Sequence, residues 1–175
     1  MALAFAATKG VLQFEDMSAS SGVRFVLQNN ATPIRRLPES MVGGVAAFDY
    51  NNDGRIDLFF PGAAAAPALY RNEGGFRFTD VTADSGLSRT GFTIGAAAGD
   101  FDNDGNVDLF IAGYRDCHLY RNTGGKFRDV TADSGIGCPG WSVAAAWVDY
   151  DRDGLLDLFV VSYLKYLETN VLVCH

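Results

Sequence analysis

One nine-residue segment occurs three times in this 175-residue chain, and its composition restricts the fold more than any other feature. Every copy carries oxygen-bearing side chains at positions 1, 3, 5 and 9 and a glycine at position 6. With the main-chain carbonyl of position 7, such a segment supplies the roughly six to eight oxygen ligands that Ca²⁺ requires. The copies are DYNNDGRID at 49–57, DFDNDGNVD at 100–108 and DYDRDGLLD at 149–157.

The three segments predict calcium-binding loops with one common ligand set. Position 7 is arginine, asparagine or leucine, side chains so different that the main-chain carbonyl is expected to bind instead. The glycine at position 6 is expected to adopt a positive φ, which turns the chain back around the ion. The predicted ligands of about three Ca²⁺ ions are Asp49, Asn51, Asp53, Arg55 and Asp57; Asp100, Asp102, Asp104, Asn106 and Asp108; and Asp149, Asp151, Asp153, Leu155 and Asp157.

These loops differ from the EF-hand, which needs a glutamate at position 12 and a helix on either side. Position 12 here is Phe60, Ile111 or Val160, within β-branched and aromatic runs that lack a helical period. The loops are therefore expected to join strand to strand. A hairpin turn without metal is the alternative for one isolated copy, but three copies whose crowded carboxylates would repel one another favour a cation.

The repeat extends beyond the loop to a unit of about 50 residues. LYRNEGGFRFTDVTADSGL from Leu69 recurs as LYRNTGGKFRDVTADSGI from Leu119. Each unit contains a run of small residues, the loop, an apolar run, the LYRN segment and a run ending in DVTADSG. Four short strands separated by turn residues predict one blade of a β-propeller. The fold class is therefore all-β, with β-propeller blades of four antiparallel strands, and the small-residue run suits the innermost strand.

The pattern G-A-A-x-x-D-x-[DN]-x-D-G-x-x-D-L followed by LYRN-x-G-G-x-F-x-D-V-T-A-x-S-G resembles the FG-GAP/VCBS repeat family. The DVTADSG signature is similar to the repeat region of proteins that carry an ASPIC/UnbV domain, although no ASPIC/UnbV segment is visible. The resemblance covers about residues 14 to 163. It implies an integrin-α-like β-propeller, extracellular, with Ca²⁺ in the loops at one end of the blades.

Repeat boundaries suggest a partial propeller of about two and a half blades, which would form an open arc because closed rings need at least about four blades. The missing blades of the same protein are then expected partners. The expected divisions are an N-terminal tail that is a candidate remnant of a signal peptide (1–13), a closing strand and linker (14–40), blade 1 (41–90), blade 2 (91–139) and a partial blade 3 (140–175).

The net charge of −7 follows largely from the loops, which hold eleven of the 21 acidic residues. Three bound Ca²⁺ ions would therefore neutralise most of it. An acidic chain without a basic face argues against nucleic acid as a partner. No apolar run reaches the length of a membrane span.

The three cysteines leave the pairing open. An odd number fits free thiols or a broken pair, and Cys117 and Cys138 lie on different units, where a disulfide between them is one alternative. His118 has no matching ligand pair in the sequence, so a structural role is expected for it.

The expected function is a non-catalytic, calcium-binding scaffold in a secreted or cell-surface protein, extracellular or periplasmic, that presents a rigid surface to a protein or carbohydrate ligand. The sequence does not identify that ligand. The alternative is the propeller part of a calcium-dependent polysaccharide-degrading enzyme whose active site lies outside this chain. No catalytic or phosphate-binding motif occurs in the sequence, and Asp80, Asp84, Asp129 and Asp133 belong to the DVTADSG signature, where turn and cap roles are expected.

Overall fold

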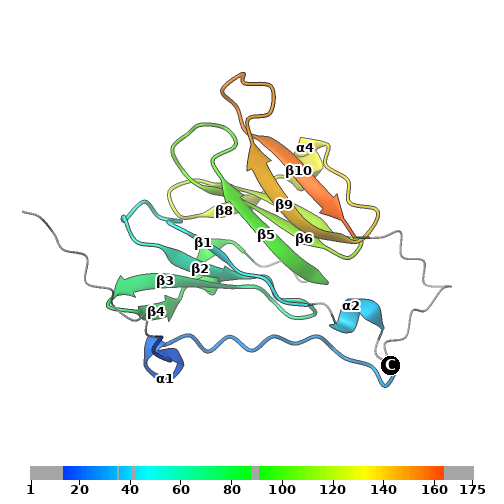
Figure 1. Cartoon of the computed structure of the whole chain (residues 1–175). Coiled ribbons are helices and arrows are strands. Elements are labelled where there is room, and N and C mark those ends of the chain that lie inside the picture. Colours follow the sequence, from blue (N-terminus) through cyan, green and yellow to red (C-terminus); the bar gives the residue numbers. More distant parts are fainter. Residues whose placement is uncertain (1–13, 35, 41, 88–90, 164–175) are drawn as a thin grey trace, which may run out of the picture.

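The computed structural model describes residues 14–34, 36–40, 42–87 and 91–163, and over these residues the protein is an open arc of antiparallel sheets (Figure 1). The expected N-terminal tail 1–13 and Cys174 lie outside the described residues. The expected fold class is confirmed: two four-stranded sheets and a two-stranded sheet follow one another along the chain.

Each sheet is a meander, in which consecutive strands pair antiparallel. Apolar residues alternate along the strands or fill them completely, because most strands have another sheet on at least one face. The first sheet contains β1 (Ala46–Phe48), β2 (Asp57–Phe60), β3 (Ala68–Gly74) and β4 (Arg77–Asp80). The second contains β5 (Thr93–Gly99), β6 (Asp108–Gly113), β7 (Cys117–Asn122) and β8 (Phe127–Asp129), and the third contains β9 (Ser142–Val148) and β10 (Asp157–Ser162).

Over the described residues there are four single-turn helices. α1 (Ser18–Ser21) and α2 (Leu37–Ser40) precede the first strand, and α3 (Thr82–Ser85) and α4 (Thr131–Ser134) follow the fourth strand of the first and second sheets. α3 and α4 are the TADS part of the DVTADSG signature. In both, the preceding aspartate accepts hydrogen bonds from the amide and hydroxyl of the threonine, at 2.9 and 2.6 Å for Asp80 and at 3.0 and 2.6 Å for Asp129. These bonds satisfy donors at the start of the turn, so both aspartates have the turn role expected for them, and neither is the N-cap of its helix.

Within 14–40, the expected closing strand and linker, residues 14–17 form no strand, and Phe14 is 98 % exposed. In the complete sheets the fourth strand pairs with the third strand of its own sheet, and no such strand lies beside Phe14 among the described residues. The chain instead enters α1 and then runs along the first sheet. There, the Arg24 amide donates to the Tyr70 hydroxyl at 3.2 Å, and the Phe25 and Phe60 rings stack at 4.9 Å.

The core lies between successive sheets. One cluster joins the first sheet to the second, with Phe59 and Leu109 both fully buried, and another joins the second sheet to the third around Phe110. Phe159 occupies the corresponding position of β10 but is 64 % exposed. No described sheet covers that face of β10.

The first strands of the sheets approach one another closely, as expected for innermost strands. An added Cβ on Gly44 would lie 2.4 Å from the Ile94 carbonyl oxygen, and one on Gly95 would lie 2.5 Å from the Val143 carbonyl oxygen. Real Cβ atoms do not approach a carbonyl so closely, so only glycine fits there. The small residues therefore determine how tightly the sheets converge.

Candidate metal centres

The three aspartate-rich loops join the first strand of each sheet to the second, and they follow one another along one edge of the arc (Figure 1). The expectation that they connect strand to strand is confirmed. Gly54, Gly105 and Gly154 have φ values of +81°, +85° and +90°, as the turn at position 6 requires. The loops therefore share one backbone course.

The carboxylate at position 1 organises each loop by accepting two main-chain amides, from positions 5 and 6. In the first loop, Asp49 accepts from Asp53 at 3.1 Å and from Gly54 at 2.7 Å. Asp100 and Asp149 accept the equivalent pairs in the other loops, at 3.1 and 2.9 Å and at 3.1 and 3.2 Å. In addition, the position 5 carboxylate accepts the amide of position 7, for example from Arg55 to Asp53 at 2.9 Å. The amides thus hold these carboxylates in place.

The carboxylate at position 9 is the most buried group in the first two loops. Asp57 and Asp108 have no exposed surface. Asp108 accepts the Asn122 amide at 2.7 Å and the Phe101 amide at 3.0 Å. Asp57 accepts the equivalent amides of Asn72 and Tyr50 at 2.7 and 3.1 Å. The asparagine of each LYRN segment is therefore a supporting residue that the loop motif alone does not reveal.

Burial also changes the acidity of these two groups. It raises the pKa of Asp108 to about 6, against the lowering effect of its two amide hydrogen bonds, and the neighbouring Asp102 and Asp104 raise it further. Burial likewise raises the pKa of Asp57. In contrast, hydrogen bonds from Asn106 hold the pKa of Asp104 below its usual value. A buried carboxylate that resists ionisation is one that a nearby cation would stabilise.

Carboxylate oxygens converge in two of the three loops. Ligand oxygens of Asp100, Asp102 and Asp108 lie within 4.8 Å of one another, as do those of Asp149, Asp151 and Asp153. Asp104 and Asp157, also predicted ligands, lie outside these two groups. The first loop has Asn51 at position 3, so three carboxylates and one amide oxygen form its predicted side-chain set.

Two buried oxygen atoms at position 3 lack a hydrogen-bond donor. They are Oδ1 of Asn51 and Oδ1 of Asp102. A buried acceptor without a partner is costly, and in native proteins it usually has a donor, a water molecule or an ion. Both atoms belong to the predicted ligand sets, so the residues present fit a cation that takes oxygen ligands.

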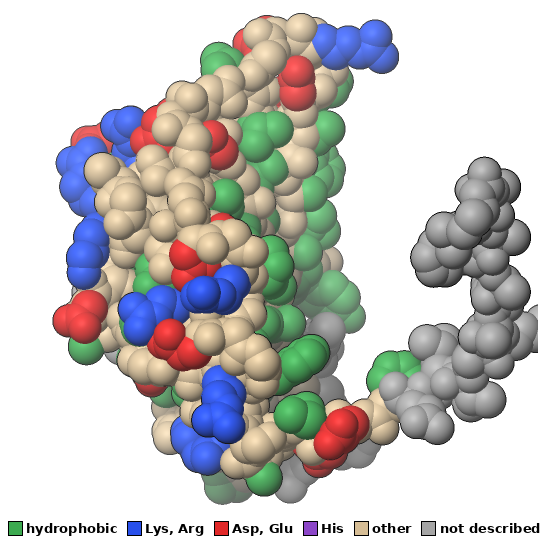
Figure 2. Space-filling model, turned by 90° about the vertical axis from the view of Figure 1, so that its left-hand side faces the viewer, with side chains coloured by type: hydrophobic (Ala, Val, Ile, Leu, Met, Phe, Trp, Pro, Cys, Tyr) green, Lys and Arg blue, Asp and Glu red, His purple; other side chains and the backbone are tan. Residues whose placement is uncertain are grey.

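Arginine side chains already pair with some loop carboxylates, which the sequence did not predict. Arg121 lies 2.6 Å from Asp102 and 3.5 Å from Asp104, and the Arg55 side chain lies 3.3 Å from Asp53. In the first sheet, the equivalent Arg71 pairs with Glu73 at 2.7 Å instead. Figure 2, which views the molecule from the left-hand side of Figure 1, shows acidic and basic side chains interspersed on that face.

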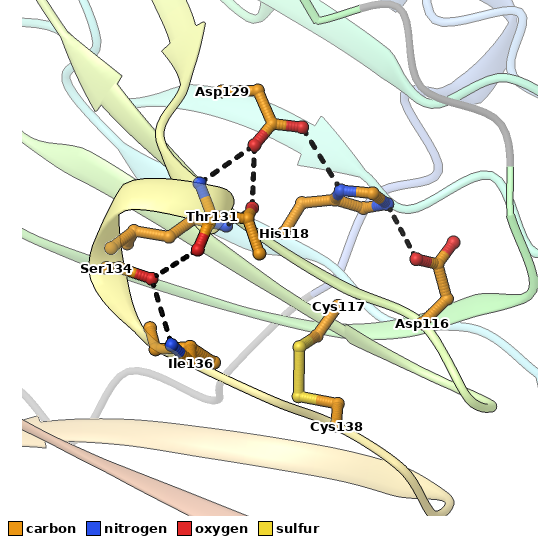
Figure 3. Close-up of a disulfide and its surroundings, with 9 residues drawn as sticks. Asp116, Cys117, His118, Asp129, Thr131, Ser134, Ile136 and Cys138 are labelled. Carbon is orange, nitrogen blue, oxygen red and sulfur yellow. Dashed lines mark hydrogen bonds and ion pairs between the residues drawn. A yellow bond between two sulfur atoms is a disulfide. The ribbon is translucent and has the colours of Figure 1, made fainter.

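A second polar cluster lies beside a disulfide on the second sheet (Figure 3). Cys117 and Cys138 are bonded, which decides the pairing that the sequence left open. His118 is 5 % exposed and its ring nitrogens lie 3.1 Å from Asp116 and 3.3 Å from Asp129. Asp129 thus joins the histidine to Thr131 at the start of α4, which supports the expected structural role of His118.

Repeated sheets with aspartate-rich loops between their first and second strands define a protein of the β-propeller repeat class. The model of the FG-GAP-like repeat matches residues 49–111 and 100–160, well over half of the chain. The chain therefore belongs to the FG-GAP repeat family, as the sequence predicted. A search of curated proteins found no match to it.

Family membership indicates a propeller-like interaction scaffold, and repeats of this family are typically non-catalytic. Within the described residues, no helix has both the length and the apolar character needed to cross a membrane. The disulfide is compatible with an extracellular location, where oxidising conditions preserve such bonds.

Proposed function

We propose that the three loops bind Ca²⁺ and that the chain is a calcium-stabilised interaction scaffold of a secreted or cell-surface protein, presenting a rigid surface to a protein or glycan. The observation that carries the proposal is the pair of buried, donor-free oxygens of Asn51 and Asp102, each at position 3 of a loop. The converging carboxylates of the second and third loops support it. When bound, Ca²⁺ supplies positive charge to groups that otherwise repel one another.

The donor set favours Ca²⁺ over Mg²⁺. Carboxylate, amide and carbonyl oxygens on a flexible loop suit a large ion with variable coordination, whereas Mg²⁺ requires near-octahedral geometry and retains its water. The Arg121 guanidinium pairs with Asp102 and Asp104 in the second loop, so an ion bound there either displaces Arg121 or binds with the guanidinium still beside it. Extracellular modules bind Ca²⁺ with dissociation constants of about 0.1 to 1 mM, the range expected here.

Thermal unfolding with Ca²⁺, with Mg²⁺ and with EDTA tests the proposal. Because the ion binds the folded loops, the melting temperature should rise with Ca²⁺ concentration through the millimolar range, and Mg²⁺ at equal concentration should raise it less. A matched variant, Asp102→Asn, removes one predicted ligand charge and should reduce the Ca²⁺ effect. Equal stabilisation by both ions, or none by either, would contradict the proposal.

A further inference from the structure

Neighbouring loops are hydrogen-bonded to each other through the residue at position 4. Nδ2 of Asn52, in the first loop, donates to the Gly105 carbonyl at 3.0 Å and to Oδ1 of Asn106 at 3.2 Å, both in the second loop. Nδ2 of Asn103, in the second loop, donates to the Gly154 carbonyl of the third at 2.8 Å. The same position of one loop thus reaches position 6 of the next.

The backbone of position 4 makes this contact available. Asn52 and Asn103 have φ values of +58° and +55°, in the left-handed region that asparagine adopts more readily than most side chains. Both residues are exposed, so their conformation is not imposed by packing in a core. Arg152 occupies position 4 of the third loop with a similar φ of +65°.

The contact joins two predicted ligand sets. Position 4 lies between the ligands at positions 3 and 5 of its own loop, and its acceptor at position 6 immediately precedes the carbonyl ligand at position 7 of the next loop. Ordering either loop therefore fixes one partner of the hydrogen bond, so ordering the other loop costs less conformational entropy. Such a link couples two binding events reciprocally.

From this geometry we propose that the loops bind Ca²⁺ cooperatively, with Asn52 coupling the first loop to the second and Asn103 coupling the second to the third. The proposal rests on calcium binding by the loops, as proposed above. Asn52 and Asn103 are positioning residues, because they are not in the predicted ligand sets.

The first two loops have an additional connection. Nδ2 of Asn122 donates to the Tyr50 carbonyl at 2.8 Å, while the amide of Asn122 donates to Asp108 at 2.7 Å. Position 2 of the first loop is thereby connected to position 9 of the second. Replacing Asn52 should therefore leave part of the coupling between the first two loops, which makes Asn103 the sharper test.

The glycine amides at position 6 allow each loop to be followed separately. Gly105 and Gly154 donate to Asp100 and Asp149 at 2.9 and 3.2 Å, so their amide resonances report on their own loops in a ¹H–¹⁵N titration. The coupling is the ratio of two Ca²⁺ dissociation constants of the second loop. The numerator is measured with the third loop blocked by Asp151→Ala, and the denominator with the third loop intact. We expect a ratio of about five, at the lower end of typical coupling factors.

In Asn103→Gly, which tolerates the same φ, the ratio should fall to about one while each loop still binds Ca²⁺. Asn103→Asp keeps the shape of the side chain but places an acceptor against the Gly154 carbonyl, and it should lower the ratio too. Arg152→Gly makes the matched backbone change in the third loop and should leave the ratio unchanged. Melting in EDTA verifies that each variant folds.

The outcomes are distinguishable. Calcium binding at each loop with a ratio of one in the parent protein would overturn the coupling and leave the proposed function intact. A ratio as high as that of the parent protein in both Asn103 variants would overturn the proposal that Asn103 couples the second loop to the third. If millimolar Ca²⁺ shifts none of the glycine resonances, the proposed function fails, and the coupling fails with it.

Discussion

Lowering the pH from 7.5 to 5.0 should weaken Ca²⁺ binding to the second loop. Burial raises the pKa of Asp108 to about 6, so at pH 5.0 the group is mostly protonated in the metal-free protein. Since the proton must leave before the carboxylate binds the ion, the affinity falls by about tenfold, or about 1.4 kcal/mol. At pH 7.5 the carboxylate is already ionised, and this effect nearly disappears.

Calorimetric titration in two buffers with different ionisation enthalpies measures the protons released. The second loop should release about 0.9 proton per ion at pH 5.0 and close to none at pH 7.5, as follows from a pKa one unit above the lower pH. Asp57 should act in the same direction in the first loop, because burial raises its pKa as well. Equal affinities at both pH values without proton release would refute the reasoning.

The raised pKa of Asp108 weakens Ca²⁺ binding at low pH, but in the metal-free protein it favours folding at low pH. A carboxyl group whose pKa is higher in the folded than in the unfolded state contributes stability that is fully present below about pH 4 and is lost as the pH rises through about 6. With solvent screening near the exposed loop, the loss is on the order of 1 to 3 kcal/mol. Urea unfolding in EDTA across this range should show it, and saturating Ca²⁺ should reverse the trend.

Three further predictions concern a buried side chain, the disulfide and one loop carboxylate. Phe110→Ala should cost about 3–5 kcal/mol in urea unfolding, whereas Phe159→Ala should cost far less, because Phe110 is fully buried and Phe159 is 64 % exposed; similar losses would contradict the described packing. Replacing Cys117 and Cys138 together by serine should cost about 3 kcal/mol, since the disulfide closes a loop spanning 21 residues; an unchanged urea midpoint would show that the bond is not formed. Asp104→Ala should lower the melting temperature in Ca²⁺ but only slightly in EDTA, and an equal loss in both would make Asp104 a turn residue rather than a ligand.

The loop course and the blade architecture could be predicted because they depend on local chemistry. Glycine at position 6 requires a positive φ wherever the loop occurs, and all three copies adopt it. Small residues such as Gly95 permit the close approach of first strands regardless of the rest of the chain. The repeat strengthens the predictions of the loop course and of the blade architecture, because the same residues recur in the same order.

Other features depend on neighbours that one repeat does not reveal. Phe59 and Phe159 have the same place in the motif, but only Phe59 is covered by another described sheet. Arg71 and Arg121 also have the same place, yet Arg71 pairs with Glu73, whereas Arg121, which has Thr123 there, contacts the second loop instead. The difference between Glu73 and Thr123 is the sequence signal that could have predicted the pairing of Arg121 with the second loop.

Counting bound ions by native mass spectrometry tests the central claim most directly. The parent protein in calcium acetate should bind about three Ca²⁺ ions, and a variant with Asp149, Asp151 and Asp153 replaced by asparagine should bind about two. The same spectra in magnesium acetate should show fewer bound ions. A parent protein that binds no Ca²⁺, or a variant that binds as many ions as the parent, would contradict the account.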